Sequence, residues 1–212
     1  MGRYSSDVVS STTSFNQQQS PMMGNWPTEF NNAMVSIDLN GTIIEDKLLQ
    51  APSDVVLIPG VLDAIRSIRL KKHKLFVLSD QPGITKGLVR TETINESWQH
   101  MMQLFGQAGI MSIDGFLYNT SDLRNDEYAK PNLGMIKRAE NELPGNLKFK
   151  GGFHVGDSMD DLKMAQKASM TPVLVLTGNG KDTLKDLDKH SNKELKRKTK
   201  VYQTLQQFAD SL

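Results

Sequence analysis

The chain has 212 residues, a net charge of +1, 38% hydrophobic residues and no cysteine. This length is typical of one domain with tails, and the near-zero charge excludes a chain that acts as a whole as a polycation on nucleic acid. The lack of cysteine excludes disulfides and thiolate zinc sites, and no apolar run reaches the about 18 residues of a membrane span. We therefore expect a cytoplasmic protein that makes no membrane contact and is a monomer or a weak homodimer.

Three regions differ in composition along the chain. Residues 1–30 are polar and aperiodic, and we expect a disordered or mobile N-terminal extension there. We predict one folded domain over residues 31–180 and a helical, Lys-rich segment over residues 181–212 that packs on it. The basic run within that segment, Lys193–Lys200, could contact nucleic-acid phosphates, but such a run is more often the solvated face of a helix.

Short apolar runs alternate with amphipathic helical patterns through the middle of the chain. We predict strands at residues 33–38, 74–80, 115–119, 152–157 and 171–178. We predict helices at residues 60–70, 91–110, 132–143 and 160–169. Strands that alternate with helices indicate βαβ units around a parallel sheet. The predicted fold class is α/β, a Rossmann-like three-layer sandwich with a central parallel sheet.

Polar and acidic residues stand where the predicted strands end. Asp38 ends the first strand, Ser79 and Asp80 end the second, and Asp157 ends the fourth. Right-handed crossovers place all these ends on one edge, where open α/β sheets bind their ligands. A single Asp after a strand is usually a turn or helix cap, but several at one edge predict a binding site.

Four motifs resemble those of the haloacid-dehalogenase superfamily of phosphohydrolases. They read DLNGT at residues 38–42, LSDQPGITKG at 78–87, AKPNLGM at 129–135 and HVGDSMDDLKMA at 154–165. The long second motif and the Lys-Pro-x-x-Gly-Met third motif together resemble the branch of histidinol-phosphate and heptose-bisphosphate phosphatases. The resemblance covers roughly residues 33–180. It implies a Mg²⁺-dependent phosphatase for a small phosphorylated substrate, with a short flap in place of a cap domain.

The resemblance also implies a metal site. By similarity, Asp38 and Asp157 would bind Mg²⁺ through their carboxylates, and Asn40 would bind it through its backbone carbonyl. Asp161 would orient a neighbouring ligand or a metal-bound water. No zinc is expected, because residues 118–131 lack the Cys and His of the zinc loop that many heptose-bisphosphate phosphatases carry.

The same resemblance implies the residues that bind and attack the phosphoryl group. Asp38 would attack phosphorus and form an aspartyl-phosphate. Ser79 and Lys130 would hold the phosphate oxygens, and Asp80 and Gln81 complete the predicted substrate-binding set. We expect Lys130 to lie at an exposed edge, where it would contribute little to stability.

Two residues depart from the family pattern in a way that bears on catalysis. Residue 40 is Asn where the family has an Asp that protonates the leaving group and then activates water, and an amide can do neither. Residue 80 is Asp where this branch usually has Asn. Three hypotheses stay open: natural loss of activity, a laboratory substitution at position 40, or transfer of the acid–base role to Asp80. An inactive phosphate-binding homologue and a nucleic-acid 3′-end phosphatase are the alternative functions.

Two further positions concern the surroundings of the site. Ala129 precedes Lys130 where heptose-type members often have an Arg that contacts substrate, so the resemblance fixes the reaction class more firmly than the substrate. His154 lies inside a predicted strand, and we expect a packed core histidine there and not a ligand.

Overall fold

The computed structural model describes residues 33–142 and 148–212, so the expected N-terminal extension lies outside the described residues. Within them, six strands form one sheet in the order β3-β2-β1-β4-β5-β6, and every neighbouring pair is parallel. This is the order of a doubly wound α/β fold, in which the chain reverses direction across the sheet between β1 and β4. The predicted fold class is confirmed.

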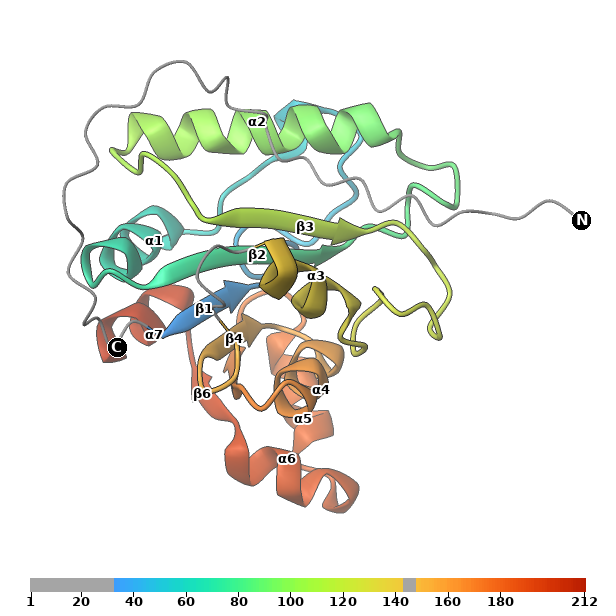
Figure 1. The fold of residues 1–212 in the computed structure, drawn as a ribbon, viewed down its shortest axis with the longest axis vertical. Helices are drawn as coiled ribbons and strands as arrows, with labels where there is room; N and C mark the ends of the chain where they lie inside the picture. The colour runs from blue at the N-terminus through green and yellow to red at the C-terminus, as the bar shows by residue number, and fades with distance from the viewer. Residues whose placement is uncertain (1–32, 143–147) are drawn as a thin grey trace, which may run out of the picture.

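The elements follow one another as strand and helix along most of the chain (Figure 1). The strands are β1 Met34–Ile37, β2 Lys74–Asp80, β3 Gly115–Asn119, β4 Phe153–Gly156, β5 Thr171–Val175 and β6 Lys200–Tyr202. The helices are α1 Val61–Leu70, α2 Thr91–Gln107, α3 Gly134–Glu142, α4 Met159–Lys167, α5 Gly180–Leu187, α6 Lys193–Lys198 and α7 Leu205–Ser211. In the part of the chain that is described, no helix combines the length and the apolar character needed to cross a membrane.

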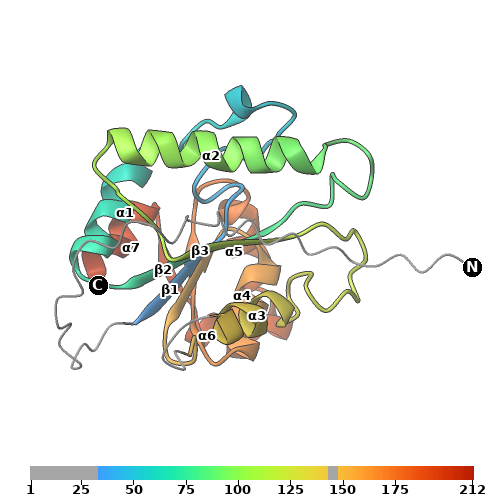
Figure 2. The ribbon, with the colours of Figure 1, turned by 45° about the horizontal axis from the view of Figure 1, so that its top comes forward.

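Helices cover both faces of the sheet (Figure 2). Helices α1, α2 and α7 lie on one face, and α3, α4, α5 and α6 lie on the other. Alternate strand residues point to opposite faces, so Leu75 and Val77 pack in the first layer while Phe76 and Leu78 pack in the second. Because both faces are buried, the strands read as continuous apolar runs, which is why the sequence reveals them.

The C-terminal segment contains a strand that the sequence analysis did not predict. Lys200–Tyr202 forms β6 and pairs in parallel with Val173–Val175 of β5. This strand has three residues, lies at the edge of the sheet and exposes Lys200 and Val201. The sequence therefore has no apolar run from which the strand could be predicted. Helix α7 follows, with its N-terminus capped by the Thr204 hydroxyl, and packs against α1.

A short flap connects β1 to α1 at residues 45–59. It holds one turn of 3-10 helix at Pro52–Asp54 and returns to the sheet through backbone hydrogen bonds from Glu45 to Val56 and from Ile58 to Ile43, 2.9 and 3.0 Å long. With so few residues, the flap covers one side of the β1 end without forming a domain of its own.

Candidate active site

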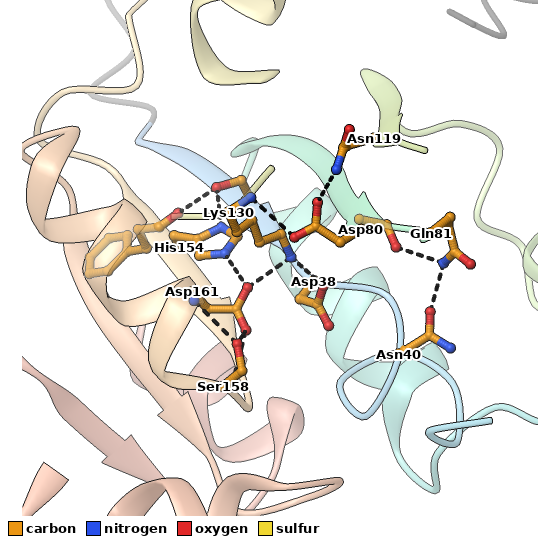
Figure 3. Close-up of polar contacts among 12 residues, drawn as sticks. Asp38, Asn40, Asp80, Gln81, Asn119, Lys130, His154, Ser158 and Asp161 are labelled. Atoms are coloured by element: carbon orange, nitrogen blue, oxygen red, sulfur yellow. Dashed lines mark hydrogen bonds and ion pairs between the residues drawn. The ribbon is translucent and has the colours of Figure 1, made fainter. Parts of the chain in front are cut away.

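A buried ion cluster lies at the carboxyl ends of β1 and β4, at the point where the strand order reverses (Figure 3). The Lys130 ammonium lies between Asp38, which directly follows β1, and Asp161 on α4. It donates to the Asp38 carboxylate and, at 2.8 Å, to Oδ1 of Asp161. The structure therefore brings together three of the predicted site residues from three separate segments.

Lys130 is buried, so the expectation that it lies at an exposed edge was wrong. Its side chain is 4% exposed, because the loop between β3 and α3 folds over the strand ends and turns the side chain inward. Burial alone would lower the pKa of Lys130, but Asp161 and Asp38 outweigh burial and raise the pKa above its usual value. The ammonium therefore stays charged and contributes to stability.

Asp161 is saturated with hydrogen-bond donors. Besides Lys130, its Oδ1 accepts from Nε2 of His154 at 3.1 Å, and its Oδ2 accepts from the backbone N–H and the hydroxyl of Ser158 at 3.1 and 2.5 Å. Burial would raise the pKa of Asp161, but Lys130 and His154 together hold it below its usual value. The carboxylate is ionised, and its contacts suit it to fixing Lys130 in place.

His154 is a buried core residue, as the sequence predicted, and it also supports Asp161. It is fully buried on β4, and its Nδ1 lies 2.8 Å from the hydroxyl of Ser36 on the neighbouring strand β1. Burial lowers the pKa of His154, so the ring is neutral. Nε2–H then donates to the Asp161 carboxylate and the Ser36 hydroxyl donates to Nδ1. This contact was not foreseen, because it depends on which strands are neighbours.

Asp157 follows β4 and is enclosed by glycines. Its Oδ2 accepts from the backbone N–H of Asn179 at 2.7 Å. Gly41 and Gly178 both have positive φ, and a Cβ at either position would collide with this carboxylate. Burial raises the pKa of Asp157 to about 6, although the Asn179 N–H opposes that shift.

The three carboxylates fit a divalent cation. Ligand atoms of Asp38, Asp157 and Asp161 all lie within 4.8 Å of one another. One ammonium contacts two of these three carboxylates, and burial raises the pKa of Asp38 well above its usual value despite Lys130. Such buried negative charge calls for a further positive charge, and Mg²⁺ prefers oxygen ligands of this kind. Metal binding by these residues and by the Asn40 carbonyl stays a prediction.

A second, uncharged group of side chains lies beside the ion cluster. Nε2 of Gln81 donates to Oδ1 of Asn40 at 2.8 Å and to the Ser79 hydroxyl at 2.9 Å. Nδ2 of Asn40 donates to the backbone carbonyl of Lys47 in the flap at 3.0 Å. The Asn40 amide thus acts as donor and acceptor at once, and it links β2 to the flap (Figure 3).

Asp80 points away from Asn40. Its Oδ1 accepts from Nδ2 of Asn119 at 2.9 Å, and its Oδ2 accepts from the backbone N–H of Lys130 at 3.1 Å. Burial raises the pKa of Asp80, and Lys130 and Asn119 oppose that shift. Asn119 was not among the predicted site residues. It ends β3 and is paired with Asp80 in the register of these two parallel strands. The sequence alone does not reveal this pairing.

Comparisons with known proteins agree with this geometry. The family of HAD-hydrolase-like proteins matches residues 127–207. D-glycero-beta-D-manno-heptose-1,7-bisphosphate 7-phosphatase of Neisseria meningitidis is 28% identical over 179 residues, which cover 83% of this chain and 92% of the relative. The chain is thus similar to HAD-hydrolase-like proteins over its C-terminal part and to heptose-bisphosphate phosphatases over most of its length. The family match includes the third and fourth motifs, and so spans Lys130, Asp157 and Asp161.

Solved structures of haloacid-dehalogenase-like proteins share the whole architecture. The D,D-heptose 1,7-bisphosphate phosphatase of B. bronchiseptica, solved with magnesium and phosphate, superposes with a TM-score of 0.75 at 25% identity and covers 84% of this chain and 97% of its own. The corresponding phosphatase of Burkholderia thailandensis gives 0.60 at 27% identity over 85% and 97%. The resemblance drawn from the four motifs is therefore confirmed.

Proposed function

We propose that this haloacid-dehalogenase-like protein is a Mg²⁺-dependent phosphomonoester hydrolase that transfers a phosphoryl group to Asp38 and is slow to release it. The observation that carries the proposal is the buried cluster in which Lys130 bridges Asp38 and Asp161, with Asp157 within reach of the same ion. A nucleophile, a phosphate-binding ammonium and a metal-binding pair of carboxylates are thereby assembled in one place.

The residues of this chain supply binding, orientation and attack. Asp38 attacks phosphorus as the bond from phosphorus to the leaving oxygen breaks, and the Lys130 ammonium, held by Asp161, donates to an oxygen of the phosphoryl group. Ser79, 1% exposed at the end of β2, donates to another of these oxygens. A bound Mg²⁺ supplies charge neutralisation between the carboxylates and the phosphate.

Because residue 40 is Asn, the attack on phosphorus can proceed while the proton-transfer steps lack their acid and base. The amide of Asn40 cannot protonate the leaving oxygen or take a proton from water. The geometry gives no support to a transfer of that role to Asp80, because both Asp80 oxygens accept hydrogen bonds on the β3 side. An ester with a good leaving group would therefore phosphorylate Asp38, and the phosphoenzyme would then persist.

For the substrate, we propose a small phosphorylated sugar of the heptose-bisphosphate type. The support comes from the relatives, whose names are those of heptose-bisphosphate phosphatases. Ala129, buried beside Lys130, replaces the Arg that heptose-type members often use, so contacts with the distal part of the sugar differ in this chain.

The nucleic-acid alternative has little support in the charge pattern. Two cations of the basic run are already paired, Lys196 with Asp188 and Lys198 with Glu194, both at 2.8 Å. A third, Lys200, lies 5.5 Å from the centre of the Phe153 ring. These contacts engage three of the five cations of the run, so it does not present an unbroken row of free cations for phosphates.

The test is to incubate the protein with Mg²⁺ and p-nitrophenyl phosphate, quench with acid and search for a phosphoryl adduct by mass spectrometry. We expect a stoichiometric adduct on the peptide that contains Asp38, together with a burst of nitrophenol. Asp38→Asn is the matched control and should give neither signal. An adduct-free protein with no burst would leave only phosphate binding, and the inactive homologue would then replace the enzyme.

A further inference from the structure

Asp80 departs from the family pattern, and the proposed phosphatase chemistry does not explain why a carboxylate stands there. A carboxylate near a bound phosphate is unfavourable unless it is paired with positive charge or hydrogen-bonded. Each Asp80 oxygen faces a donor, Nδ2 of Asn119 at 2.9 Å and the backbone N–H of Lys130 at 3.1 Å. We propose that Asp80 is a positioning residue, which anchors the loop that carries Lys130 to the end of β2.

The two hydrogen-bond donors that face Asp80 match a carboxylate. An Asn side chain offers one acceptor oxygen and one donor group, so in the same place its NH₂ would face another N–H. Asn119 cannot turn over to receive that NH₂, because its own amide is held at both ends. Its Oδ1 accepts from the N–H of Ser121 at 3.0 Å, and its Nδ2 donates to the carbonyl of Ser121 at 3.1 Å.

The link matters because it joins the Lys130 loop to the sheet. Several hydrogen bonds of this loop are internal to it, such as those from Gly134 to the carbonyl of Glu127 and from the Asn132 side chain to the carbonyl of Asp126, both 2.8 Å long. The Lys130 ammonium and the Thr85 hydroxyl, which donates to the carbonyl of Thr120 at 2.5 Å, also tie the loop to its surroundings. Asp80 differs from these contacts because it lies on β2, next to Ser79, and holds the backbone of Lys130 itself. This strand end therefore helps to set the distance between the hydroxyl and the ammonium that are to hold the same phosphoryl group.

Side chains at the end of β2 alternate in direction, as they do along a strand. The Ser79 hydroxyl and Gln81, just after β2, are hydrogen-bonded to each other, and Gln81 is bonded to Asn40. Asp80 points instead to Asn119 and the Lys130 backbone (Figure 3). The inference rests on the proposed function for its catalytic readout, but the hydrogen bond itself can be measured without any activity.

The first experiment measures hydrogen exchange of the Lys130 amide by NMR in the wild type and in Asp80→Asn. We expect exchange to accelerate on the order of tenfold, as for the loss of one hydrogen bond to a charged group. The matched control is Asp114→Asn, because Asp114 also accepts from a backbone N–H, that of Leu75 at the other end of β2, at 2.8 Å. Equal protection of the Lys130 amide in wild type and Asp80→Asn would overturn the proposal, whatever the activity.

The second experiment measures binding of tungstate, a phosphate mimic, and the kcat and KM for p-nitrophenyl phosphate. Asp80→Asn should weaken tungstate binding and raise KM on the order of tenfold, as for other residues that orient a functional side chain, and Asp114→Asn should not.

The outcomes separate this inference from the proposed function. If Asp80→Asn abolishes kcat, leaves tungstate affinity unchanged and leaves the exchange of the Lys130 amide unchanged, then Asp80 transfers protons and the positioning role is wrong. If the wild type binds no tungstate and Lys130→Ala changes nothing, the proposed function fails, and the exchange rate of the Lys130 amide still decides the role of Asp80.

Discussion

The two halves of the candidate site differ in charge. On the β4 side, Lys130 and three carboxylates form a buried ionic network. On the flap side, the Asn40 amide accepts a neutral hydrogen bond from Gln81 and donates one to the backbone carbonyl of Lys47. Binding of a metal and a phosphate requires charge, and proton transfer requires a titrating group near the leaving oxygen. In the proposed function, the ionic half binds and attacks the phosphoryl group, while Asn40 and Gln81 of the neutral half supply no titrating group.

The largest expected effect comes from giving the flap side a titrating group. Asn40→Asp should raise steady-state turnover of alkyl phosphates by about 10²–10⁴-fold, the usual worth of general acid–base catalysis. The new carboxyl would face the Lys47 carbonyl where Nδ2 now donates, so it should favour its protonated form. Turnover of sugar phosphates and p-nitrophenyl phosphate measures the gain.

The chemistry of the leaving group provides the control for Asn40→Asp. The gain should be greater for the alkyl ester than for the nitrophenyl ester, whose leaving group needs no proton. An equal or absent gain on both would show that another residue disables the site.

Breaking the ionic side should cost mainly stability and affinity. Lys130→Ala leaves Asp38 and Asp161 buried without their cation, and removal of one partner of a buried pair costs about 3–5 kcal/mol. Urea denaturation measures this loss, and titration with tungstate measures the affinity. Lys185→Ala is a control, because Lys185 also forms an ion pair, with Asp182, but is exposed. Similar small losses in both variants would contradict the buried cluster.

The pH dependence of metal binding gives an intermediate effect. The pKa of Asp157 is raised to about 6 from its usual value of 3.8, so its proton is bound below pH 6 and released above it. Mg²⁺ competes with that proton, and its affinity should therefore fall about tenfold between pH 7 and pH 5. Calorimetric titration at both pH values tests this, and Asp157→Asn should bind weakly at both. A pH-independent affinity would remove Asp157 from the metal site.

The smallest effect is expected from the neutral hydrogen bonds. Gln81→Ala removes the donor that faces Asn40 and Ser79, which should lower the free energy of unfolding by about 0.5–1.5 kcal/mol. Thermal unfolding measures this change, with Gln50→Ala in the exposed part of the flap as the reference. A loss of unfolding free energy as large as that of Lys130→Ala would mean that the neutral half of the site stabilises the fold as much as the ionic half, which would contradict the comparison.

The sequence alone predicted the fold and named the charged residues that the structure brings together, for physical reasons. The buried strands are apolar runs, and parallel topology brings Asp38 and Asp157 to one edge. The sixth strand, Lys200–Tyr202, was missed because a short, half-exposed edge strand has no such run. The partners of Asp80 and His154 could not be predicted. Asn119 lies beside Asp80, and Ser36 beside His154, only because of the register of adjacent strands.

The burial of Lys130 was mispredicted for a related reason. A motif gives the identity of a residue but not the path of the loop around it. In the structure, the N–H of Lys130 meets Asp80 and the side chain turns inward between Asp38 and Asp161. Residues of a polar loop read as exposed in the sequence, and only the packed chain shows which of them lies inside.

Gly41 and Gly178 give this site an evolutionary constraint that its chemistry alone would not impose. Both have positive φ, they approach each other closely, and a Cβ on either would strike the Asp157 carboxylate. In a scan of all substitutions, these two positions should tolerate almost no replacement, although neither glycine carries a reactive group. Such a scan should show them to be as intolerant of substitution as Asp157 itself, because what they contribute is the lack of a side chain next to its carboxylate.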